Sequence, residues 1–206
     1  MREQKSEYVG DDALKRLLRR YRCPAPFHVV RMRFWGAIAS PSPDISFIPV
    51  VQRLWSDGRP EFPNARDVNA FLQQMQSLWN ELTRYQDGSP TLELTKVGPI
   101  DTPKGLHAAT KLRVEELYDG FLEGFTDGKT ELDVPPGTAA IVHSVEKAIE
   151  VLASIRNTFA RPGEADEEMF AECVRGFSLV DPAVQVDLNA IAVAVKKCRD
   201  ERGPLH

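Results

Sequence analysis

Apolar residues recur along most of the chain at intervals of three and four, which is the spacing of one face of an α-helix. The clearest run predicts a helix at the centre of a core and consists of Val68, Phe71, Leu72, Met75, Leu78, Trp79, Leu82 and Tyr85. Similar spacing predicts helices over residues 11–21, 27–40, 47–55, 106–128 and 138–160. Nothing alternates long enough to predict a sheet. We therefore expect an all-α fold, a multihelical bundle of about seven or eight helices.

Two more helices are expected in the C-terminal part. Residues 164–168 are mostly acidic and suit the positive N-terminal end of a helix dipole, so the first of these helices is predicted to begin there. Its predicted core side consists of Met169, Phe170, Cys173, Val174 and Phe177. Asp181-Pro182 has the cap-and-proline pattern of a helix start, so a separate last helix is predicted from there. We expect residues 87–105 to be mainly loop, residues 1–10 to be a flexible tail, and residues 11–206 to be one helical domain.

The stretch from Glu115 to Gly128 carries the most distinctive pattern, EELYDGFLEGFTDG. Phe121 and Phe125 are four residues apart, which predicts that both lie in the core. Gly120 and Gly124 repeat with the same spacing, and each interior glycine costs a helix about 1 kcal/mol relative to alanine. We therefore predict that another backbone packs closely on these glycines. The neighbour is the helix near Gly36, the long helix ending near Asn80, or a second copy of the chain.

The same helix carries a column of acids at a spacing of four: Glu115, Asp119, Glu123 and Asp127. Residues 1–33 contain nine Lys/Arg and four Asp/Glu, a net +5, so the remainder carries −9 to give the total of −4. Arg16, Arg19 and Arg20 belong to this basic part. Three interpretations of the acid column are open. It is a solvated face, it forms ion pairs with the basic first helix within one subunit or between two, or it is a metal or catalytic site.

Composition narrows the class of protein. The chain has 206 residues, 42% of them hydrophobic, enough for one large domain or two small ones. Its three cysteines are scattered and form no CxxC pair, which fits a reducing cytoplasm. The polar N-terminus has no secretory pattern, and no apolar run is long enough to span a bilayer.

The order of four segments, FWGAIASPSP, FIPVVQRLW, FLQQMQSLWNEL and ELYDGFLEGF, resembles the YecA/YgfB-like family of uncharacterised bacterial proteins. The counterparts of the family's motifs are Gly36 with Pro41 or Pro43, Ile48-Pro49 with Trp55, Asn80, and Gly120-Phe121 with Gly124. The resemblance covers residues 11–127 and leaves 128–206 as a C-terminal helical part. It implies an all-α fold in the bacterial cytoplasm and no general enzymatic activity. The Cys/His metal-binding tail of some members has no counterpart in VKKCRDERGPLH.

The sequence contains no phosphate loop and no GxGxxG, HExxH or GxSxG motif, and its four histidines lack ligand spacing. We therefore predict no catalytic residue, cofactor or metal site. The leading hypothesis is a non-enzymatic adaptor or regulator that binds protein through a helical surface. The alternative is an enzyme or small-ligand-binding protein with a polar site beside residues 115–127. The net charge of −4 disfavours nucleic acid as a partner, and no membrane partner is expected. A second copy of the chain, forming a homodimer, is the alternative to a different protein partner. The candidate surface residues are Arg16, Arg19, Arg20, Glu115, Asp119 and Glu123.

Overall fold

The computed structural model describes residues 8–43, 45–55, 60–129, 132–160 and 166–202. Over these residues the fold is all-α, without strands, as predicted. The first part contains α1 (Asp11–Arg20), α2 (Phe27–Ala39), α3 (Phe47–Gln52), α4 (Ala65–Thr83) and the 3₁₀-helix η1 (Arg84–Asp87). The second part contains α5 (Pro103–Val114), the π-helix η2 (Glu115–Leu122), α6 (Glu123–Thr126), α7 (Thr138–Thr158) and α8 (Glu167–Arg202).

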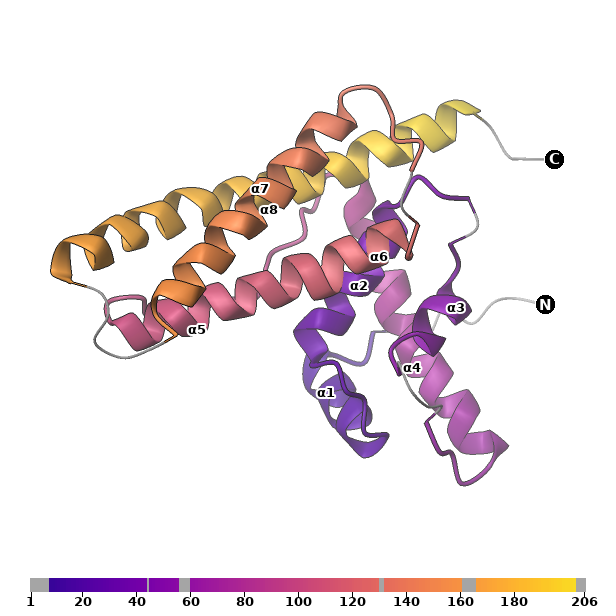
Figure 1. The fold of residues 1–206 in the computed structure, drawn as a ribbon. Coiled ribbons are helices and arrows are strands. Elements are labelled where there is room, and N and C mark those ends of the chain that lie inside the picture. Colours follow the sequence, from indigo (N-terminus) through magenta and orange to yellow (C-terminus); the bar gives the residue numbers. More distant parts are fainter. Residues whose placement is uncertain (1–7, 44, 56–59, 130–131, 161–165, 203–206) are drawn as a thin grey trace.

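The segments α5, η2 and α6 follow one another without a break and form a rod through the middle of the molecule (Figure 1). One end of the rod, η2 and α6, packs against α2, and α1, α3 and α4 gather around α2. The other end, α5, packs against α7, which pairs with α8. The rod therefore joins an N-terminal group of helices to a C-terminal helical pair.

The two phenylalanines of the rod lie in the core, which confirms the prediction from their spacing. Phe121 is 0% exposed and Phe125 is 1% exposed. Their rings stack with centroids 5.6 Å apart. They belong to one hydrophobic cluster that also includes Leu14 of α1 and Leu188 of α8, so a single core runs through the described part of the chain.

Three glycines allow α2 to lie directly on the rod. An ideal Cβ at Gly124 would overlap the carbonyl oxygen of Arg33, and one at Gly120 would lie 2.6 Å from Cβ of Met32. From the other side, a Cβ at Gly36 would lie 2.8 Å from the amide nitrogen of Phe125. The predicted neighbour of the glycines is thus α2, one of the three alternatives that the sequence left open.

The π-helix η2 changes the hydrogen-bond register within the rod. The amide of Glu123 bonds to the carbonyls of Tyr118, five residues back, and Gly120, three back, whereas the amide of Asp127 bonds to that of Glu123, four back. If each amide serves one carbonyl, the four carbonyls of residues 119–122 have only the three amides of residues 124–126 as helical donors. Arg33 donates to the carbonyl of Asp119 from Nε at 3.2 Å and from Nη2 at 2.7 Å. A side chain of α2 therefore satisfies the carbonyl that the register change frees.

The predicted break at Asp181-Pro182 is wrong. Residues 167–202 form one helix of 36 residues with Pro182 inside it. Phe177 and Val184 are buried on either side of the proline and hold both halves against the same core. Met169, predicted as a core residue, is 42% exposed. Residues 91–100 are extended but form no strand, which fits the predicted loop.

We predict that Gly124→Ala destabilises the protein. Relieving the overlap with the Arg33 carbonyl must shift α2 or the rod, which costs about 1–3 kcal/mol and outweighs the gain of roughly 1 kcal/mol in helix propensity. Urea unfolding of the purified variant measures the change.

Gly98→Ala is the matched control, because a Cβ there meets nothing within 4 Å. A Gly124→Ala protein as stable as the parent would contradict the packing of α2. A change confined to the monomer–dimer equilibrium in sedimentation would assign the glycines to an intermolecular contact.

Candidate interaction surface

The four acids of the column lie in different environments. Glu115 is half-buried and lies 2.9 Å from Nε2 of His28 on α2, and Lys111 is 3.8 Å away. Asp127 pairs with Arg53 at the end of α3. The side chains of Asp119 and Glu123 are exposed. The column is thus partly a solvated face and partly tied to helices other than α1.

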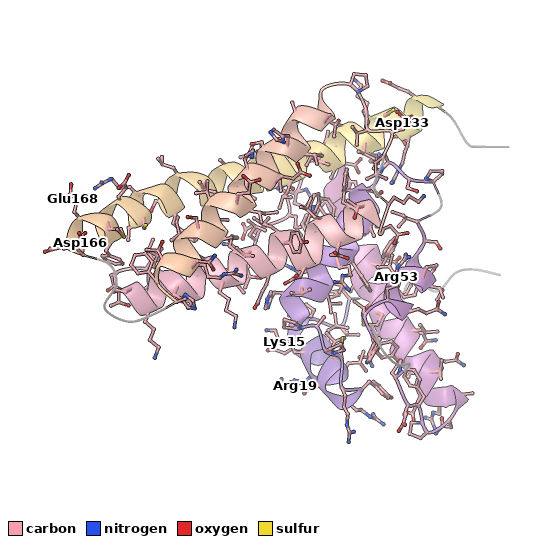
Figure 2. The ribbon with its side chains drawn as sticks, in the orientation of Figure 1. Lys15, Arg19, Arg53, Asp133, Asp166 and Glu168 are labelled. Carbon is pink, nitrogen blue, oxygen red and sulfur yellow. The ribbon has the colours of Figure 1, made fainter. Side chains whose placement is uncertain are left out.

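The basic residues of α1 do not meet these acids. Arg16, Arg19 and Arg20 are exposed, and Arg20 lies 3.6 Å from Asp67 of α4. Figure 2 shows Lys15 and Arg19 on α1, far from the tip of the α7–α8 pair where Glu168 lies. Within the described ranges no ion pair joins α1 to residues 115–127, so the match to α1 inside one subunit is not formed.

A buried ion network lies beside the column and was not predicted. Glu116 is 0% exposed and pairs with Arg113, which is itself buried. Arg113 also donates to Asp181 of α8, with Nη2 3.3 Å from Oδ2. Arg31 of α2 lies 4.0 Å from the other carboxylate oxygen of Glu116. The network therefore links α2, the rod and α8 through Arg113 and Glu116, which are buried, and through Arg31 and Asp181, which are partly buried.

Side chains of this region also hold the extended segment at residues 92–95. Asn189 of α8 accepts from the amide of Leu92 at 2.9 Å and donates to its carbonyl at 3.1 Å. The amide of Thr95 bonds to Glu116 at 3.1 Å. Arg31 donates to the carbonyl of Glu93 at 2.6 Å. Side chains thus occupy both edges of the segment, where neighbouring strands would bond in a sheet.

The outer face of α8 carries an exposed apolar ridge, which we define as Leu179, Ala183, Val186, Ala190 and Val193. The spacing is four and three in turn, the pattern of a helix seam that packs on another helix. Leu179 is 74% exposed, Val186 68% and Val193 37%. The sequence contains this pattern, but the break predicted at Pro182 divides it in two. The ridge is therefore a surface that the sequence analysis missed.

By length and composition alone, α8 is also the one described helix that could cross a membrane. Its best window has a mean hydropathy of 1.3, and 33% of that window is buried within the fold. No membrane-spanning stretch is predicted from the sequence, where Asp181 and Asp187 interrupt the apolar run. Core helices of soluble proteins meet the same criterion. Among the described residues no group of three or more His, Cys, Asp or Glu side chains is arranged to hold a metal ion.

Comparisons of the chain with protein-family models, curated proteins and solved structures find no match.

We predict that Glu116→Gln destabilises the protein by up to about 3–5 kcal/mol, because the buried Arg113 then keeps Asp181 alone as its charge partner. Glu115→Gln, one residue earlier in a partly exposed pair with His28, should cost less, about 1 kcal/mol. Urea unfolding of both variants gives the difference. Equal effects of the two substitutions would mean that the buried network contributes no more than a surface pair.

We predict that Asp119→Asn stabilises the protein modestly at neutral pH. Burial, followed by the charge of Glu115, raises the pKa of the Asp119 carboxyl above its ordinary value. The folded state therefore binds the proton more tightly than the unfolded state, and stability falls as pH rises through the interval between the two pKa values. Because the group is largely exposed, the gain in Asp119→Asn stays below about 1 kcal/mol.

Unfolding measured at neutral pH and below about pH 4, the usual range of the carboxyl pKa, tests this, because the gain should vanish in acid. Asp12→Asn is the contrasting control. The hydrogen bond from Lys15 lowers the pKa of Asp12, so its removal should reduce stability at neutral pH. Effects of the same sign in both variants would contradict the opposite directions of the pKa shifts at Asp119 and Asp12.

Proposed function

We propose that this protein is a non-enzymatic adaptor or regulator of the bacterial cytoplasm that binds a protein partner through the ridge of α8. The observation that carries the proposal is the exposure of Leu179 and Val186, at 74% and 68%. Leaving apolar area in water costs about 25 cal/mol per Å², and a row of such side chains at helical spacing typically marks a contact surface. The resemblance to the YecA/YgfB-like family supports the cytoplasmic setting and the absence of an assigned reaction.

The charge of α8 supports one class of partner. Residues 167–195 contain a single basic residue, Arg175, and five acids, of which Asp181 is already paired with Arg113: Glu167, Glu168, Glu172, Asp181 and Asp187. The end of α8, beyond the ridge, is mixed in charge, with Lys196, Lys197 and Arg199 beside Asp200 and Glu201. An apolar ridge on an acidic helix is complementary to an amphipathic helix whose polar flanks are basic. Such a helix would place apolar side chains between those of the ridge and its cations along the acids.

The acidic residues near the ridge also bear on what else could cover it: a second copy of the chain, a membrane or helix α1. Two copies of α8 packed ridge to ridge in the same direction would bring their acidic first halves together. A bilayer with anionic lipids would repel the acids that flank the ridge. The basic helix α1 of this chain does not qualify either, because its apolar side chains Leu14, Leu17 and Leu18 are buried in its own core.

We predict that a fluorescent model peptide with leucines at intervals of three and four and lysines elsewhere binds the protein. The same peptide with glutamate in place of lysine should bind more weakly. Leu179→Ser combined with Val186→Ser should weaken binding of the lysine peptide at least about tenfold, because both side chains lie on the ridge. Fluorescence anisotropy measures the affinities, which should fall with added salt.

Val151→Ser is the matched control, since Val151 is an exposed valine of α7 outside the ridge. The ridge variants should unfold within about 0.5 kcal/mol of the parent, because surface substitutions seldom do more. Equal binding of the two peptides, or full binding by the ridge variants, would overturn the proposal. A Leu179-dependent dimer in sedimentation, or Leu179-dependent flotation with phosphatidylcholine vesicles, would replace the partner helix with a second copy or a membrane.

A further inference from the structure

A cleft of about 440 Å³ opens between α1, α2 and the extended residues 93–96. Its apolar lining comes from Phe27 and Leu94, and its cationic lining comes from Lys15, Arg31 and Lys96. Nζ of Lys15 lies 5.8 Å from the centre of the Phe27 ring. The cleft thus combines an apolar surface with positive groups from three elements, within the size range of small-molecule sites.

Arg31 is the cation held most firmly in the cleft. Its side chain is only 17% exposed, and its Nη2 donates to the carbonyl of Glu93 at 2.6 Å. Its Nε is buried and donates to no acceptor in the described part of the chain. A guanidinium has five N–H donors and no acceptor, so Arg31 keeps donors for an oxyanion while its bond to Glu93 and its pairing with Glu116 at 4.0 Å fix its position.

We propose that this cleft binds a small organic anion, with a carboxylate or phosphate oxygen on Arg31 and its apolar part against Phe27 and Leu94. Lys15 and Lys96 complete the positive surroundings of the oxyanion. The site is separate from the ridge of α8, so this proposal is independent of the proposed protein partner.

Acidic groups also line the cleft, and they limit the class of ligand. In the lining itself Asp11 and Glu93 face three cations, and His28 is paired with Glu115. Two of the cations also have an acidic partner outside the lining, since Lys15 lies 3.1 Å from Asp12 and Arg31 lies 4.0 Å from Glu116. The carboxylate of Asp11 already accepts from the hydroxyl of Tyr8. The positive charge left for a ligand is therefore small, and a ligand with one oxyanion matches the lining better than a polyanion does.

Benzoate is the first probe, because it carries one carboxylate on an apolar ring. Its neutral isostere benzamide tests the charge, and phenyl phosphate tests the other oxyanion. The ¹⁵N–¹H resonance of Arg31 Nε, assigned by its loss in Arg31→Lys, reports on the site directly. We expect a saturable shift of this resonance with benzoate or phenyl phosphate, whichever oxyanion the site prefers, and none with benzamide.

Lys15→Ala combined with Lys96→Ala should weaken binding about tenfold, because it removes two charged donors without touching the bonds of Arg31. Lys147→Ala with Lys197→Ala is the matched control, since both of these lysines are exposed on α7 and α8, outside the cleft. Equal loss of affinity in both double variants would show that binding depends only on general charge attraction, which would overturn the proposed site. Shifts that never saturate, or equal shifts with benzamide, would also overturn it.

Discussion

The fold depends on the close approach of α2 to the rod. Gly36 on one helix and Gly120 and Gly124 on the other bring backbone against backbone, where any Cβ would overlap a main-chain atom or Cβ of Met32. This approach positions Arg33 to donate to the carbonyl that the register change of η2 frees. The π turn and the glycines therefore form one arrangement, because the carbonyl can lose its helical donor only where a donor from α2 replaces it.

The buried charges extend this arrangement to the C-terminal helices. Glu116 follows the start of η2, and its carboxylate meets Arg113, Arg31 and the amide of Thr95. Arg113 in turn holds Asp181. Burying an ion pair gives little net stability, but removing one partner is costly, so such a network fixes relative positions more than it adds stability. Here it fixes α8 and residues 92–95 against the rod, and with them the ridge and one wall of the cleft.

Much of the fold could be predicted from the sequence, because periodicity records which side of each helix is buried. The burial of the two phenylalanines and the close packing on the glycines both followed from local pattern. The site residues were harder to predict. In EELY the sequence does not distinguish Glu115, which is half-exposed, from Glu116, which is fully buried. The difference arises from contacts with residues far along the chain, Arg31 and Thr95, and from a π turn that shifts the register of a regular helix.

Pro182 illustrates how tertiary packing overrides a local signal. A proline inside a helix costs about 3 kcal/mol, so a break was the reasonable expectation. Phe177, Val184 and Leu188 are each at most 2% exposed, and burial of each is worth about 1.5–3 kcal/mol, which together exceeds that cost. Pro182 itself is exposed, so the carbonyl of Ser178 that loses its donor can turn to water. Continuity through Pro182 is also what aligns Leu179 with Val186 and Val193. The packing that keeps α8 whole thus creates the ridge on its opposite face.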